Sequence, residues 1–169
     1  SACVEIIMVD NNSTDGSADI VRRYSQIRLL SEHKPGAYAA RNLGIAEAAG
    51  DVLAFTDSDC APCASWLESM SVALCRPDVG IALGRHRFAS DSLALSLLAD
   101  YEGAKATYVF CGDVKELYFG YTNNMAVKRG LFDRLGLFRE IARGADTVFV
   151  RRAVDEYGRN IARYCPEAC

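Results

Sequence analysis

The chain has 169 residues, of which 50% are hydrophobic and 24% are charged. This length predicts one domain over residues 1–169 with one hydrophobic core, and the composition excludes disordered, collagen-like and coiled-coil proteins. The 19 basic and 22 acidic residues leave a net charge of −3, which is too little positive charge to hold a polyanion, so we expect no nucleic-acid partner. Because there is no bilayer-spanning apolar run and no leader before the first predicted strand, we expect no transmembrane segment and a cytoplasmic protein.

The seven cysteines form an odd and irregular set in a chain large enough to fold without disulfides. Cys60 and Cys63 are the one close pair, and no second pair or histidine stands at zinc-binding spacing from them. We therefore expect reduced thiols, in preference to a disulfide framework or a zinc site.

Short apolar runs alternate with helical patterns along most of the chain. Residues 4–9 are apolar and rich in β-branched side chains, as in strands buried on both faces, and they end at a polar turn over 10–16. Beyond residue 85 the alternation weakens, and 108–121 has no clear period. In chain order we predict a strand over 4–9, a helix capped by Ser17, a strand over 27–30, a helix over 37–49, a strand over 52–56, a helix behind Pro62, a strand over 79–83, a helix over 93–101, a helix over 145–157 and a short strand over 161–164.

This alternation predicts an α/β fold with a mostly parallel sheet flanked by helices. In such folds ligands bind at the carboxyl ends of the strands. The two Asp-rich turns, 10–16 and 57–59, directly follow predicted strands. We therefore expect a ligand site at the edge of the sheet where these turns lie.

Asp57 and Asp59 form an Asp-x-Asp motif at the end of a predicted strand. Their carboxylates are two residues apart, so they point the same way and can share one cation. Mg²⁺ or Mn²⁺ accepts two such oxygens and takes its remaining ligands from water and a substrate diphosphate. Alternatively, both carboxylates satisfy backbone donors of the turn and cap the following helix. The spacing alone favours neither interpretation.

Asp10 and Arg41 are candidates for contact with a nucleoside. Turn chemistry explains most of the polar residues around Asp10, but if its strand neighbours that of Asp57, its carboxylate faces the same cleft. There it can accept a hydrogen bond from a base imide or a ribose hydroxyl. Arg41 can donate to a base carbonyl, or it is a solvated helix arginine.

Asp146 lies in the first turn of the predicted helix over 145–157. It is either a general base or an ordinary partner of the helix dipole. No glycine-rich loop of the NTPase or dinucleotide type follows a predicted strand. A diphosphate would therefore be neutralised by a cation, which acts as a Lewis acid on the leaving phosphate.

Together these segments resemble the family 2 inverting glycosyltransferases, which have the GT-A fold. The likeness spans almost the whole chain and keeps the family's order. Its three most specific segments are VDNNSTDGS (9–17), GAYAARNLGI (36–45) and GDVLAFTDSD (50–59). Further on, NNMAVKR (123–129) resembles the segment beside the acceptor, LGLF (135–138) resembles the turn that follows it, and GADT (144–147) stands in place of the catalytic Glu-Asp.

The resemblance implies transfer of a sugar from a nucleotide-diphosphate sugar, with a UDP-sugar as the expected donor, to a carbohydrate or lipid-linked acceptor. Asp146 would be the catalytic base, which deprotonates the acceptor hydroxyl as it attacks the anomeric carbon with inversion. The implied donor-side residues are Asp10 and Arg41 at the nucleobase, Asn12 beside them, Asp57 at the ribose and Asp59 at a divalent cation, Mg²⁺ or Mn²⁺, that it shares with Asp57. Asn123 and Asn124 would lie on the acceptor side.

Three departures from the family pattern bear on these expectations. Ala145 replaces the usual Glu beside the base, and the sequence stops at Cys169, where family members usually continue toward a metal-side histidine and acceptor-binding elements. The family also has a central strand before its first Asp motif, whereas Ser1 stands almost directly on the second strand. Either the neighbouring strands close up, or a second copy of the chain supplies the strand, or the sequence lacks an N-terminal piece.

Two other functions remain open from the sequence. A non-catalytic GT-A-like module for nucleotide binding or assembly would keep the architecture without turnover. A nucleotidyltransferase would share the metal-binding carboxylates and the α/β sheet, but the chain has no recognisable Gly-rich triphosphate loop.

Overall fold

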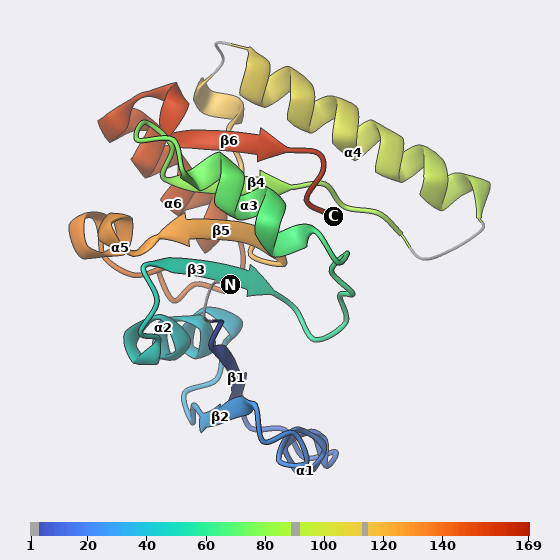
Figure 1. Cartoon of the computed structure of the whole chain (residues 1–169), viewed down its shortest axis with the longest axis vertical. Coiled ribbons are helices and arrows are strands. Elements are labelled where there is room, and N and C mark those ends of the chain that lie inside the picture. The colour runs from blue at the N-terminus through green and yellow to red at the C-terminus, as the bar shows by residue number, and fades with distance from the viewer. Residues whose placement is uncertain (1–3, 89–91, 113–114) are drawn as a thin grey trace.

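The computed structural model describes residues 4–88, 92–112 and 115–169 and confirms the α/β class (Figure 1). The strands are β1 (Ile6–Asp10), β2 (Ile27–Ser31), β3 (Val52–Thr56), β4 (Ile81–Gly84), β5 (Asn124–Lys128) and β6 (Ala162–Cys165). The helices are α1 (Ser17–Val21), α2 (Ala37–Glu47), α3 (Trp66–Leu74), α4 (Leu93–Cys111), α5 (Arg129–Leu135) and α6 (Ala145–Tyr157), and two short 3-10 turns are η1 (Lys115–Leu117) and η2 (Arg159–Ile161).

The strands form two sheets. One is the parallel pair β1 and β2, and the other has the order β3-β5-β4-β6. In the larger sheet β4 and β6 are parallel, whereas β5 is antiparallel to both of its neighbours. Neither β5 nor α5 was among the elements predicted from periodicity. The reason is that only residues 125–127 of β5 are apolar, between Asn124 and Lys128, so its sequence shows neither alternation nor a long apolar run.

Within the described residues β1 bonds only to β2, and β3 bonds only to β5. Of the three alternatives for the family's central strand, closure of its neighbours is thus not seen among the described residues. Helix α2 packs on β1, where a Cβ at Gly44 would lie 3.5 Å from Val9 Cγ2. On its other side α2 buries Tyr38 and Ile45 in the main core. This helix therefore joins the small sheet to the rest of the fold.

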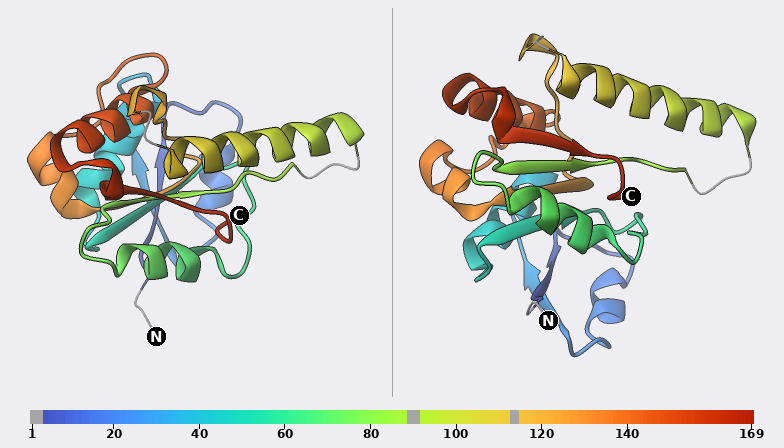
Figure 2. Two further views of the ribbon diagram at one scale, coloured as in Figure 1. Left: turned by 90° about the horizontal axis from the view of Figure 1, so that it is seen from above. Right: turned by 45° about the horizontal axis from the view of Figure 1, so that its top comes forward.

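The core lies on both faces of the larger sheet, and Figure 2 shows α3 on one face and α6 on the other. Alternate residues of the central strands point to opposite faces. Ala82 and Ala126 pack with the apolar side chains of α3. On the other face Met125 and Val127 belong to the larger cluster, which includes Phe149 of α6. Its rings pack closely, with the centroids of Phe132 and Phe149 4.7 Å apart.

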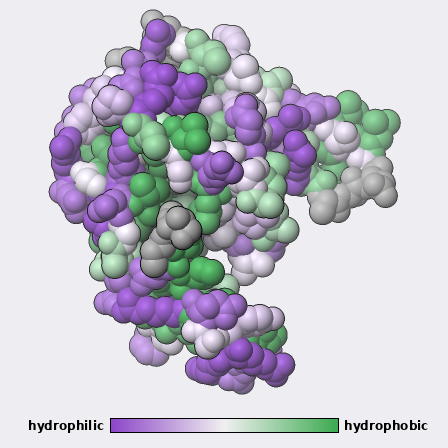
Figure 3. Space-filling model, viewed as in Figure 1, coloured by the Kyte–Doolittle hydropathy of each residue, from purple (hydrophilic) through white to green (hydrophobic). Residues whose placement is uncertain are grey.

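Helix α4 is longer than the predicted helix over 93–101 and extends past the sheet at its N-terminal end (Figure 2). It is apolar around much of its circumference, so periodicity does not mark its length. Leu93 and Leu97 are 74% and 60% exposed, and the space-filling view shows this apolar end protruding from the body (Figure 3). Among the described residues, none of the helices has both the length and the apolar character required to cross a membrane.

Asn42 of α2 fixes the loop that follows α5. Its side chain is 7% exposed, its Nδ2 donates to the Phe138 carbonyl at 2.9 Å, and its Oδ1 accepts from the Phe138 N–H at 3.1 Å. Both backbone groups of Phe138 would otherwise be buried without partners. Phe138 in turn packs against Tyr38, with the ring centroids 5.8 Å apart.

We predict that Asn42→Ala lowers the free energy of unfolding by about 2–4 kcal/mol, because it leaves two buried backbone groups unpaired. Chemical denaturation monitored by circular dichroism measures this change. The exposed Asn160 provides the matched control, since Asn160→Ala should change stability by less than about 0.5 kcal/mol. Equal stability of the two variants would contradict the role assigned to Asn42.

Candidate active site

Arg41 and Asp57 are in direct contact where α2 passes the end of β3. Arg41 Nη2 donates to Asp57 Oδ1 at 2.6 Å, and the two side chains are 20% and 40% exposed. Arg41 is thus not the freely solvated helix arginine of the alternative interpretation. Part of the guanidinium and part of the carboxylate remain open to solvent, so both groups can also contact a ligand.

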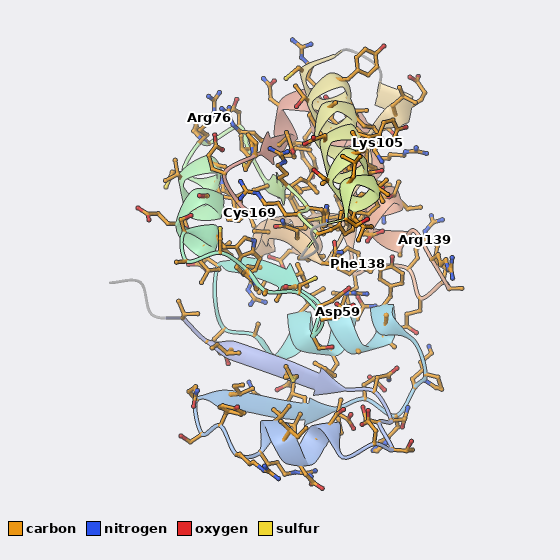
Figure 4. All side chains as sticks on the ribbon, turned by 90° about the vertical axis from the view of Figure 1, so that its right-hand side faces the viewer. Asp59, Arg76, Lys105, Phe138, Arg139 and Cys169 are labelled. Carbon is orange, nitrogen blue, oxygen red and sulfur yellow. The ribbon has the colours of Figure 1, made fainter. Side chains whose placement is uncertain are left out.

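Asp59 lies on the loop after β3, on the side of the molecule that also carries Phe138 and Arg139 (Figure 4). Its Oδ1 accepts a weak hydrogen bond from the Cys60 thiol at 3.7 Å. The described residues contain no group of three or more His, Cys, Asp or Glu side chains arranged around a cation. Asp57 and Asp59 nevertheless fit Mg²⁺ or Mn²⁺, because such ions are often held by one or two carboxylates and complete their shell with water and substrate phosphates.

Asp10 ends strand β1 and Asn12 lies just beyond it, and within the described residues β1 is not hydrogen-bonded to β3. The side chain of Asp10 bonds within its own turn, whereas that of Asn12 reaches the loop after β2. Asp10 Oδ1 accepts from the Ser13 N–H at 3.3 Å, and Asn12 Nδ2 donates to the His33 carbonyl at 3.0 Å. Asn12 has φ 65°, a left-handed conformation that Asn tolerates better than most residues. No hydrogen bond joins either residue to Arg41 or Asp57 in the described structure.

Asn11 is the residue of this turn that the sequence analysis overlooked. Its Nδ2 donates to the carbonyls of Glu32 and Lys34 at 2.8 and 2.7 Å, and its Oδ1 accepts from the Gly36 N–H at 2.8 Å. These bonds fix the loop from which α2 begins, and α2 carries Arg41. Asn11 looked like an ordinary turn residue because its partners are more than 20 residues away in the sequence.

Asp146 is buried, with 7% exposure, in the first turn of α6. Gly144 precedes this helix with φ 80°, a conformation that L side chains rarely adopt. Asp146 Oδ1 accepts from the Tyr38 hydroxyl at 3.0 Å and from the Thr147 N–H at 2.8 Å. Its Oδ2 accepts from the Thr122 N–H at 3.1 Å and from the Thr122 hydroxyl at 3.2 Å.

Helix α2 connects Asp146 with Asp57. Tyr38 and Arg41 are three residues apart, which places them on the same face of the helix, and Arg41 Cζ lies 5.4 Å from the centre of the Tyr38 ring. Tyr38 bonds to Asp146 and Arg41 bonds to Asp57. Burial, and next the negative charge of Asp146, raise the pKa of the Tyr38 hydroxyl. One helix face therefore contacts both carboxylates.

Asn123 and Asn124 have different surroundings. Asn123 Oδ1 lies 2.7 Å from His86 Nε2 and is only partly buried. Asn124 is 7% exposed, accepts from the Trp66 indole at 2.8 Å and donates to the carbonyls of Arg85 and Ala168 at 3.0 and 3.2 Å. Asn124 thus uses both ends of its amide to hold β5 against neighbouring segments, whereas Asn123 faces a more open region.

Cys60 and Cys63, which follow Asp59 in the sequence, are both free thiols. Cys63 approaches the other end of the chain, where its N–H donates to the Cys169 carbonyl at 2.7 Å. Hydrogen bonds from Ser65 and Cys169 lower the pKa of the exposed Cys63 thiol to about 7. Burial raises the pKa of the Cys165 thiol to about 11. All six cysteines in the described part of the chain are free.

The family profile of glycosyl transferase family 2 matches residues 3–136, a span that includes Asp10, Arg41, Asp57 and Asp59. The chain belongs to glycosyl transferase family 2. Among the relatives, glycosyltransferase AglE of Haloferax volcanii is 28% identical over 173 residues, which cover 89% of this chain and 51% of that protein. The chain thus spans about half the length of this family member.

Solved structures support the GT-A fold of the family. A mannosyltransferase of Pyrobaculum calidifontis, in complex with GDP-Man and Mn²⁺, superposes with a TM-score of 0.74 at 24% identity and covers 96% of this chain and 46% of its own. Glucosyl-3-phosphoglycerate synthase of Mycobacterium tuberculosis, in complex with Mn²⁺, UDP-glucose and phosphoglyceric acid, superposes with a TM-score of 0.64 at 20% identity and covers 94% of this chain and 57% of its own. The expected family and the α/β, GT-A-like fold are confirmed, with a mixed larger sheet in place of the mostly parallel one that was expected.

We predict that Cys63 reacts with iodoacetamide at half its maximal rate near pH 7, because only the thiolate is the nucleophile and its fraction rises through the pKa. Cys165 should stay unmodified in the folded protein up to pH 9. Pulse labelling at several pH values, followed by peptide mass spectrometry, measures both. A labelling midpoint for Cys63 above pH 8.5 would contradict the hydrogen bonding described for its thiol.

Proposed function

We propose that this chain is the catalytic domain of an inverting glycosyltransferase that moves a sugar from a nucleotide-diphosphate sugar, with a UDP-sugar as donor, to an acceptor hydroxyl. The observation that carries the proposal is the shared face of α2, where Arg41 contacts Asp57 and Tyr38 contacts Asp146. Membership of glycosyl transferase family 2 supports it. So do the structural neighbours in complex with GDP-Man or UDP-glucose.

In this proposal the donor lies along Arg41 and Asp57. Arg41 is part-buried and always charged, so it can hold a base carbonyl while it remains paired with Asp57. Asp57 has the more exposed side chain of the two and can accept from a ribose hydroxyl. Asp10 and Asn12, at the end of β1, complete the nucleoside side.

Asp59, together with Asp57, would hold Mg²⁺ or Mn²⁺ against the donor diphosphate. When bound, the cation would stabilise the negative charge that develops on the leaving diphosphate. The carboxylates are suited to it because both lie at the end of β3, where oxygen ligands of the right type occur two residues apart.

Asp146 would accept the proton of the acceptor hydroxyl as that oxygen attacks the anomeric carbon. A base on one side of the sugar and a leaving diphosphate on the other are the arrangement that in-line displacement with inversion requires. Asn123 is the candidate contact on the acceptor side, which we propose to be a carbohydrate or a lipid-linked sugar.

The donor site is tested by calorimetric titration with UDP and with GDP, each with and without Mn²⁺. We expect UDP to bind more tightly than GDP, and Asp59→Asn to weaken the Mn²⁺-dependent binding of UDP by about tenfold or more, because one of two cation ligands is lost.

The matched control is Asp78→Asn. Asp78 is paired with Arg76, which lies well away from Asp59 (Figure 4). The affinity of the Asp78→Asn variant for UDP should equal that of the unaltered protein. UDP binding that does not depend on Mn²⁺ and is unchanged in Asp59→Asn would refute the proposed cation site. If GDP binds more tightly than UDP, the donor nucleotide is GDP and the proposed UDP-sugar is wrong.

The proposed base is tested by Asp146→Asn, which keeps the shape of the side chain but removes its basicity. We expect the rate of nucleotide release from the donor sugar to fall by about 100-fold or more, with the Kd for UDP within about twofold of the original. Full activity in this variant would eliminate Asp146 as the base. Absence of turnover in the unaltered protein, with UDP binding intact, would favour a non-catalytic nucleotide-binding module.

A further inference from the structure

The carboxylate of Asp146 already has four hydrogen-bond donors, two on each oxygen. An ionised carboxylate has about four lone-pair positions, so all of them are in use. The N–H groups of Thr122 and Thr147 are fixed by the backbone. The other two donors are hydroxyls, one from Tyr38 and one from Thr122. Any acceptor hydroxyl that approaches Asp146 must therefore displace one of these two.

The two hydroxyls differ in how firmly they are held. The Tyr38 ring is 7% exposed, and it contacts both the Phe138 ring, with centroids 5.8 Å apart, and the Arg41 guanidinium, whose Cζ lies 5.4 Å from the ring centre. Its hydroxyl cannot leave Asp146 unless the ring moves. The Thr122 hydroxyl makes the longest of the four contacts, at 3.2 Å, and Thr122 also donates through its N–H. Thr122 is itself buried, with 3% exposure, but its hydroxyl is carried by a single rotatable bond, so it can turn away while the backbone and the Thr122 N–H stay in place.

We propose that Tyr38 is a positioning residue for sugar transfer: its hydroxyl holds Asp146 Oδ1 in place, so that Oδ2 receives the acceptor hydroxyl as the Thr122 hydroxyl turns away. This inference rests on the proposed function and assigns each oxygen of the base a separate task. It also places Tyr38 between the donor and the acceptor, because its ring supports the Arg41 guanidinium that contacts Asp57.

Tyr38 makes two separate interactions, one with Arg41 on the proposed donor side and one with Asp146 on the proposed acceptor side. The ring face stabilises the guanidinium through a cation–π contact, while the hydroxyl at the ring edge stabilises the carboxylate. Loss of the hydroxyl alone leaves the ring, the Arg41 contact and the packing with Phe138 intact. The effect on the base can therefore be separated from the effect on donor binding.

The test is Tyr38→Phe, compared with Tyr157→Phe. Tyr157 is a half-buried tyrosine at the far end of α6 that also lies under an arginine, with Arg134 Cζ 5.9 Å from its ring centre. We expect Tyr38→Phe to lower kcat for nucleotide release by about 10- to 100-fold, as for the loss of a hydrogen bond to a charged group. The donor KM, the Kd for UDP and the thermal unfolding midpoint should stay close to the original. Tyr157→Phe should keep the original kcat.

A double-mutant cycle with Asp146→Asn separates positioning from a general structural effect. If Tyr38 acts through Asp146, adding Tyr38→Phe to Asp146→Asn lowers kcat by less than about twofold. An unchanged kcat in Tyr38→Phe, a loss confined to KM, an equal loss in Tyr157→Phe or additive losses in the double variant would each overturn the inference. These outcomes leave the proposed function standing, whereas an unaltered protein without turnover would overturn both.

Discussion

A buried carboxylate requires hydrogen-bond donors, and the way in which Asp146 obtains them organises the centre of this molecule. The donors come from α2, from the segment before β5 and from the first turn of α6. Removing a charged group from water is unfavourable unless such partners are present. The three segments must therefore meet before Asp146 is stable inside the fold. The contacts that position Asp146 in the candidate site are thus the same contacts that hold these three segments together in the core.

Helix α2 has the largest share in this arrangement because each of its faces has a different partner. Its Asn42 holds the loop at Phe138, its Gly44 lies against Val9 of β1, and its Tyr38 and Arg41 reach the two carboxylates. The helix begins at a loop that Asn11 fixes through three hydrogen bonds. A substitution of Asn11 would therefore be expected to shift the start of α2, and with it Tyr38 and Arg41, although within the described residues Asn11 forms no hydrogen bond with either side chain.

The sequence was sufficient to predict the α/β class, most helices and strands, and the family, because local periodicity and ordered motifs carry that information. It identified Arg41, Asp57 and Asp146 as candidates, but not the contacts among them. Tyr38 was missed because a tyrosine inside a helix pattern reads as a core residue, and its hydroxyl partner is 108 residues away. Strand β5 was missed because its apolar run is only three residues long and lies between Asn124 and Lys128. Asn124 looked like a ligand contact in the linear motif, whereas its amide holds Trp66 and two backbone carbonyls.

Within the part of the chain that the structure describes, β1 and β3 each have one edge that bonds to no other strand. Asp10 ends β1, and Asp57 directly follows β3, so each belongs to a different sheet. Unbonded strand edges readily accept additional extended backbone. A segment that paired with both edges at once would set the spacing and the register of the two sheets, and with them the separation of Asp10 from Asp57. In the proposed function both residues contact the donor nucleotide, so backbone pairing between the two sheets would set the geometry of that contact without any change of side chain.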